Sequence, residues 1–137
     1  MKFTQIVAQA DVPNRNGRIY TKEVLAKMVE DFNSRPAKES LIGQLGFPEN
    51  NMPAGNVIDL SIASHIVEDL RLKDEHLVAD IKILDTNCGE ELIELMKNGG
   101  AVFRTQGTGK AEISGDTAII SDYTLTTINA VPTEKGA

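Results

Sequence analysis

The sequence predicts an α+β fold, in which a mostly antiparallel, barrel-like β-sheet is flanked by two helices. About six to eight segments alternate apolar and polar residues at the period of a β-strand. Two further segments carry apolar residues at helical spacing. With 137 residues the chain has the size of one domain, which we expect to span residues 1–137. The barrel is expected because closure removes exposed strand edges.

In the first third of the chain we expect a strand, a turn and a helix. The strand covers residues 3–8, and Pro13 and Gly17 lie in a turn segment. Thr21 is a favourable residue to cap the helix that follows, and Pro36 ends it, because the residue before a proline avoids helical geometry. The apolar side of this helix consists of Val24, Leu25, Met28, Val29 and Phe32.

The rest of the chain reads as strands around a second helix. A short strand over 40–45 is followed by a loop over 46–55 and by a hairpin over 57–84, with its turn at 73–76. The second helix begins near residues 85–87 and ends at the glycines 99 and 100. From residue 101 we expect short strands over 101–106, 109–113, 117–121 and 123–131, with a turn at 114–116.

Composition excludes several classes of function. The net charge of −6 and the 4% of aromatic residues argue against nucleic-acid binding. No apolar run reaches the ~20 residues of a membrane-spanning helix, and the N-terminus does not resemble a signal peptide. Cys88 is the single cysteine, so the chain has no intramolecular disulfide. We expect no metal, since the histidines and the cysteine lie far apart, and no cofactor.

Charge is distributed unevenly along the chain. Residues 1–38 contain 7 Lys and Arg and 4 Asp and Glu, whereas residues 39–137 contain 7 and 16. This asymmetry favours head-to-tail contacts between copies, so a homo-oligomer is one expectation. A soluble surface with uneven charge by chance is the alternative.

Six segments, in the same order, resemble motifs of the prohead (capsid maturation) proteases of tailed bacteriophages, which are relatives of the herpesvirus assemblin fold. The resemblance covers about residues 14–137. The segments are NRNGRIY at 14–20, followed by KEVL; GQLGFP at 43–48, like GELxHP; SHIV at 64–67, like SHII; ILDT at 83–86, like ILDTPxG; FRTQGTG at 103–109, like GxSSRGxG; and AVPT at 130–133, like VxxPS.

The family resembles serine proteases with a histidine in GELxHP and a nucleophilic serine in GxSSRG. In this chain Phe47 occupies the histidine position, Arg104 and Thr105 occupy the serine positions, and Gln106 occupies the arginine position. A serine-type mechanism requires a base beside the hydroxyl, and phenylalanine accepts no proton. The resemblance therefore predicts a protease-like fold that is not an enzyme and has no catalytic residues.

Three residues each keep two possible roles. Strand alternation places His65 on the more polar face, with Asp59 and Ser61. His65 could replace the missing base and act on Thr105, or it could hydrogen-bond within the sheet. Arg104 could pair with an acidic group or be solvated. Cys88 could gain thiolate character at the helix N-terminus, or be a half-buried structural residue without a base, since His76 belongs to a turn.

The resulting hypothesis is a non-catalytic component of a phage virion. We expect a decoration or cement protein that stabilises the capsid, binds the major capsid protein and is assembled in the host cytoplasm. Two alternatives are an active capsid maturation protease with a relocated Thr105/His65 site and a transient capsid assembly factor. Mixing the protein with unprocessed capsid or scaffold protein tests for the protease, and mass spectrometry of mature virions distinguishes a decoration protein from a transient factor.

Overall fold

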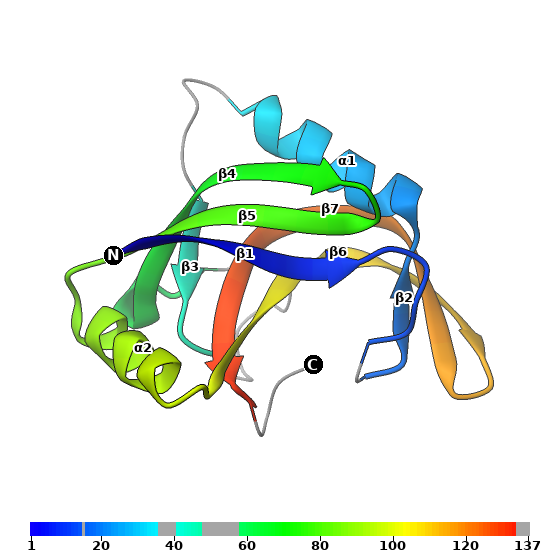
Figure 1. Ribbon diagram of the computed structural model, residues 1–137. Helices are drawn as coiled ribbons and strands as arrows, with labels where there is room; N and C mark the ends of the chain where they lie inside the picture. The colour runs from blue at the N-terminus through cyan, green and yellow to red at the C-terminus, as the bar shows by residue number, and fades with distance from the viewer. Residues whose placement is uncertain (15, 36–40, 48–57, 134–137) are drawn as a thin grey trace.

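The computed structural model describes residues 1–14, 16–35, 41–47 and 58–133, whose strands form two sheets (Figure 1). The first has the order β1-β5-β4-β3 and the second the order β2-β7-β6. Within these residues there are seven strands and two α-helices, with these bounds: β1 Lys2–Gln9, β2 Arg18–Tyr20, α1 Lys22–Asn33, β3 Leu41–Gln44, β4 Ala63–Lys73, β5 His76–Ile83, α2 Asn87–Lys97, β6 Ala101–Ser114 and β7 Thr117–Pro132.

The α+β class, with mostly antiparallel strands and two helices, is confirmed, but the sheets are open instead of forming one closed barrel. Only β2 and β7 pair in parallel, among the strands described. On one side the sheets are linked, since Leu45 forms a parallel bridge with Ala130 of β7. On the other side β1 and β6 approach without a ladder, and Phe3 packs on Phe103 at a ring-centroid distance of 5.7 Å. Side chains therefore fill part of this second seam.

The helices bury the apolar sides that the sequence pattern indicated. Val24, Leu25 and Met28 are buried on α1, which packs on β7 and β4, and Leu92 is buried on α2. Figure 1 shows the two helices at opposite ends of the molecule. Each helix thus covers a different part of the same hydrophobic core.

Two predicted elements differ from the structure. The first strand of the hairpin begins at Ala63 instead of residue 57, because Leu60–Ile62 form a 3-10 turn capped by the Asp59 side chain. The C-terminal strands are longer than predicted. They form one hairpin over β6 and β7 that passes through bulges near Gly107 without breaking. Part of the predicted strand at 40–45 and most of the loop at 46–55 lie outside the described residues.

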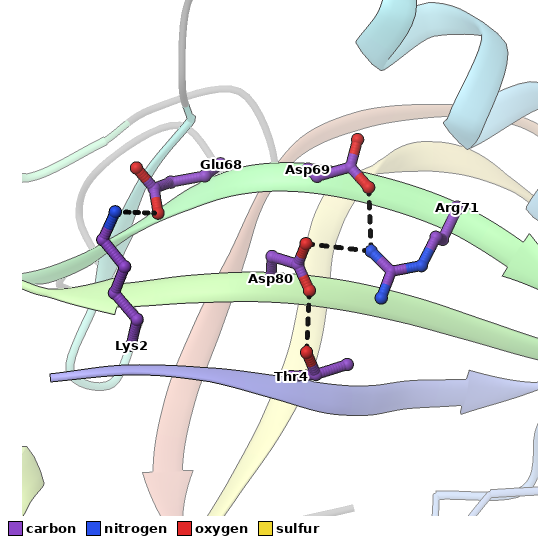
Figure 2. Close-up of polar contacts among 6 residues, drawn as sticks. All are labelled: Lys2, Thr4, Glu68, Asp69, Arg71 and Asp80. Carbon is purple, nitrogen blue, oxygen red and sulfur yellow. Dashed lines mark hydrogen bonds and ion pairs between the residues drawn. The ribbon is translucent and has the colours of Figure 1, made fainter.

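The outer face of the four-stranded sheet carries charged groups in contact with one another (Figure 2). Arg71 contacts Asp69 at 2.8 Å and Asp80 at 3.0 Å, and Thr4 donates a hydrogen bond to Asp80. The hydrogen bonds from Arg71 and Thr4 lower the pKa of Asp80. Because these groups are exposed, each ion pair adds little stability. Their presence indicates that this face of the sheet is exposed to solvent.

Among the described helices, none is long and apolar enough to cross a bilayer.

The Thr86 side chain should contribute more stability than the other helix cap. Its hydroxyl accepts a hydrogen bond from Gly89 N at 2.9 Å and donates one to Ala63 O at 2.7 Å, whereas Thr21 only accepts one from Val24 N. We expect Thr86→Ala to lower the free energy of unfolding by about 2 kcal/mol and Thr21→Ala by about 1 kcal/mol. Urea unfolding measures both values. Equal losses would contradict the additional role of Thr86, and Thr86→Ser should retain most of the stability.

Candidate functional site

Phe47 and Arg104, which occupy the histidine and first serine positions of the resembled motifs, lie against each other. Gly46 donates its backbone N–H to Ala130 O at 2.7 Å, next to the bridge formed by Leu45. These contacts hold Phe47 over the sheet, where the guanidinium carbon of Arg104 lies 5.6 Å from the centre of the ring. This distance is typical of a cation–π contact. The fold thus brings the two motif segments together, as a shared site requires.

Thr105 follows Arg104 on β6, and its hydroxyl contacts a buried tyrosine. It accepts a hydrogen bond from the Tyr123 hydroxyl at 3.4 Å, and Tyr123 packs edge-on against Tyr20. Burial raises the pKa of Tyr123, so its phenol stays protonated and can act as a donor. A protonated phenol beside Thr105 orients the threonine hydroxyl but does not remove its proton.

A groove of about 390 Å³ lies beside Thr105, between β1 and β6. Its lining includes Ile6, Arg18, Tyr20, His76, Arg104 and Thr105. Burial, and secondarily the positive charge of Arg18, lowers the pKa of Arg104, although an arginine stays charged in proteins. The groove therefore combines a hydroxyl, an imidazole and two cations, and it is open to solvent on the side of the exposed Ile6.

His65 is buried in the core and both of its ring nitrogens are engaged. Nε2 lies 2.8 Å from Ile128 O, and Nδ1 lies 2.7 Å from Ser64 Oγ. Because the carbonyl oxygen can only accept, Nε2 carries the proton and Nδ1 accepts from the serine hydroxyl. The ring also packs edge-on against Phe103. Neither ring nitrogen bonds Thr105, so the structure does not join these two residues into a nucleophile–base pair.

The environment of His65 keeps its imidazole neutral. Burial lowers the pKa of His65 to about 4, and the hydrogen bond to Ile128 only partly opposes this shift. Gly43 makes the burial possible, since a Cβ atom at this position would overlap the imidazole ring. The alternation of the strand placed His65 on a polar face, but the β4 segment around it is buried on both faces.

A cluster of three buried amides lies behind Phe47 and was not identified from the sequence. Gln44 Nε2 donates to Gln106 Oε1 at 2.8 Å and to Asn129 Oδ1 at 3.0 Å, and Asn129 Nδ2 donates to Gln106 Oε1 at 2.7 Å. The backbone N–H of Gln44 also donates to Asn129, and that of Asp59 donates to Gln44. The cluster connects β3, β6 and β7 through neutral groups.

Two of these amides stand where the motifs have charged residues. Gln44 occupies the glutamate position of GELxHP, and Gln106 occupies the arginine position of GxSSRG. Since the two side chains touch, an acid and a base at these positions would form a buried ion pair. The signal in the sequence was the simultaneous loss of both charges, and only the fold shows that the two positions are in contact.

Of the remaining candidates, Cys88 is not among the residues that line the groove, whereas His76 is. Cys88 is half-buried at the start of α2, and burial followed by the nearby Glu91 raises its pKa, which opposes thiolate formation. His76 lies at the start of β5 and lines the groove. Within the described ranges, no group of three His, Cys, Asp or Glu side chains converges as metal ligands would.

Comparison with known proteins identifies the family. The family described as prohead core protein serine protease matches residues 1–131, nearly the whole chain. The chain belongs to this family. It is therefore a capsid-associated phage protein, as the resemblance implied.

A curated protein and a solved structure, both from phage T4, agree with this assignment. The prohead core protein protease of Enterobacteria phage T4 is 33% identical over 85 residues, which are 61% of this chain and 38% of that protein. The structure of the bacteriophage T4 capsid assembly protease gp21 has a TM-score of 0.79 and 27% identity, and the match covers 95% of this chain and 80% of that one. The chain thus spans well under half the length of the curated relative.

These findings contradict the expectation that the chain is not an enzyme, because the family and both relatives are named as proteases. The expectation equated the loss of two motif residues, at Phe47 and at Arg104 and Thr105, with the loss of the reaction. Catalytic groups are defined by geometry and role, and a threonine hydroxyl persists beside a groove. The comparisons favour the alternative, a maturation protease, over a decoration protein.

His65 should make the protein less stable in mild acid. The unfolded histidine binds a proton near pH 6.5, whereas the folded one does so only near pH 4. Stability is therefore fully present above pH 6.5 and is lost as the pH falls towards 4, by roughly 2–4 kcal/mol. The measurement is the free energy of unfolding in urea from pH 7 to pH 4, for the wild type and His65→Gln. The variant should lose this part of the pH dependence, and His76→Gln should retain it.

A single buried charge in the amide cluster should destabilise the protein more than an ion pair at the same positions. We expect Gln44→Glu to lower the free energy of unfolding by about 3 kcal/mol or more, because a carboxylate would be buried without a cation. Gln106→Arg should also destabilise the protein. The double variant should recover about 1–3 kcal/mol relative to the sum of the two single losses. Gln9→Glu, at an exposed position, is the control. Strictly additive losses would show that the two positions are not coupled.

Proposed function

We propose that this protein is a peptidase that cleaves proteins of a phage prohead during capsid assembly. The observation that carries the proposal is the family match over residues 1–131, supported by the TM-score of 0.79 to a capsid assembly protease. The substrates we propose are the major capsid protein and the proteins assembled with it, encountered in the host cytoplasm. The groove beside Thr105 is the proposed site of cleavage.

Thr105 is the proposed nucleophile because it lines the groove and occupies a serine position of the motif. In this reaction Thr105 Oγ1 attacks the carbonyl carbon of the scissile peptide and forms an ester. The amine of the peptide leaves with a proton, and water then hydrolyses the ester and restores the hydroxyl. Arg18 and Arg104 line the same groove and would stabilise the negative oxygen of the tetrahedral intermediate.

The proton of Thr105 needs an acceptor, and the chain contains two histidines. His65 is committed to Ser64 and Ile128 in the core, whereas His76 lines the groove. His76 is therefore the first imidazole to test in this role. A bell-shaped or sigmoidal dependence of the cleavage rate on pH that disappears in His76→Gln, with retained stability, would identify it.

Purified protein should cleave the unprocessed capsid or scaffold protein of its phage at specific bonds. Thr105→Val keeps the shape of the side chain but removes the hydroxyl, so we expect the cleavage rate to fall by about 10³-fold or more. Gel electrophoresis and mass spectrometry of the fragments measure this loss. Thr108→Ala, at an exposed position on the same strand, is the matched control. Full activity of Thr105→Val would exclude Thr105 as the nucleophile, and no cleavage by the wild type would contradict the proposed function.

A further inference from the structure

We infer that the free edge of β6 binds an extended segment of polypeptide as an added strand, in the groove that separates β6 from β1. The inference rests on the proposed function only for the source of the polypeptide, which is a prohead protein. The binding mode itself follows from the direction of the backbone groups on the two edge strands.

The backbone groups of Phe103 and Thr105 point into the groove. In an antiparallel pair, alternate residues direct both backbone groups to the same neighbour. Thr133 N donates to Gly100 O, which places the hydrogen-bonded pairs of this ladder at residues 102 and 104 of β6. Phe103 and Thr105 therefore turn their N–H and C=O groups away from β7.

The residues opposite them on β7 confirm this direction. Ala130 pairs with Phe103, and its carbonyl accepts from Gly46 on the side away from β6. Ile128 pairs with Thr105, and its carbonyl accepts from His65, also on the side away from β6. Because the carbonyl groups of Ala130 and Ile128 point away from β6, the backbone groups of their partners Phe103 and Thr105 must point away from β7.

Within the described residues, no strand pairs with the facing edge of β1 either. Ile83 N donates to Met1 O, so the hydrogen-bonded pairs with β5 lie at the odd positions of β1. The backbone N–H and C=O groups of Thr4 and Ile6 therefore point away from β5. The carbonyl of Ile6 accepts from the side-chain amide of Gln5 at 3.1 Å, a contact that an incoming strand can replace. Each border of the groove is therefore a strand edge, and the proposed peptide pairs with the edge of β6.

An extended peptide is the occupant that fits these borders. The volume of about 390 Å³ lies within the 300–1,000 Å³ that is usual for ligand pockets. Two apolar side chains of the groove are exposed, Ile6 at 55% and Val12 at 41%. Strand addition uses such an arrangement, because main-chain hydrogen bonds supply affinity and alternate side chains contact apolar pockets.

This binding mode places a substrate peptide beside the proposed nucleophile. A strand paired with β6 receives a hydrogen bond from Thr105 N–H through one of its carbonyl oxygens. Thr105 lines the same groove. The register of the bound peptide along β6 therefore determines which of its peptide bonds lies beside Thr105.

Amide hydrogen exchange, followed by NMR, tests the inference without requiring cleavage. The probes are short overlapping synthetic peptides that cover the unprocessed capsid and scaffold proteins, added to wild type and to Thr105→Ala. In the free protein the amides at positions 103 and 105 should exchange faster than those at 102 and 104. A bound peptide should slow exchange at 103 and 105 by about tenfold or more. The inference is overturned if no peptide binds, or if a saturating peptide leaves these two amides unchanged.

A pair of substitutions locates the binding surface. Ile6→Lys should weaken peptide binding by about tenfold, which corresponds to the loss of about 1.4 kcal/mol. Ile113→Lys changes an even more exposed isoleucine, at the far end of the β6–β7 hairpin, and should leave binding unchanged. Equal effects would overturn the inference. Binding without cleavage would contradict only the proposed function, whereas cleavage that is insensitive to Ile6→Lys would contradict only the inferred binding mode.

Discussion

The two sheets are joined along one seam by buried neutral amides, and the rest of the site depends on this join. Gln44 and Asn129 connect β3 to β7 through side-chain and backbone hydrogen bonds. A buried amide that loses its partner pays the full cost of desolvation, so the cluster fixes the relative position of the sheets. Because this seam is tightly bonded, the loop with Phe47 is held over Arg104, and the opposite seam between β1 and β6 can remain open.

Local patterns predicted the elements well because they act over short distances. Helical spacing and the cap residues Thr21 and Thr86 set the two helices, and alternation set the hairpin of β4 and β5. The amide cluster could not be predicted in this way, since Gln44 and Gln106 are separated by 62 positions. The choice between open sheets and a barrel has the same origin, because it depends on contacts between strands that are far apart in the sequence.

His65 shows why a motif residue cannot be assigned a role from its strand alone. Alternation with Asp59 and Ser61 indicated a polar face, but Asp59 caps a 3-10 turn and the true strand begins later. Gly43 leaves space for the imidazole, so the histidine is buried and neutral, and it bonds Ile128 of the other sheet. Its role in the structure is thus another link across the join, next to the amide cluster.

The substituted motif residues and the open seam are connected through β6. Along this strand Arg104 contacts Phe47 and Gln106 joins the amide cluster, while Arg104 and Thr105 both border the groove. Changes at the join alter how the sheets are held together, but they leave the groove and its hydroxyl in place. A closed barrel would pair the backbone of Thr105 with β1 and remove the groove. The open seam leaves these backbone groups to solvent, where a polypeptide strand can satisfy them, and substitution at the other seam does not remove this property.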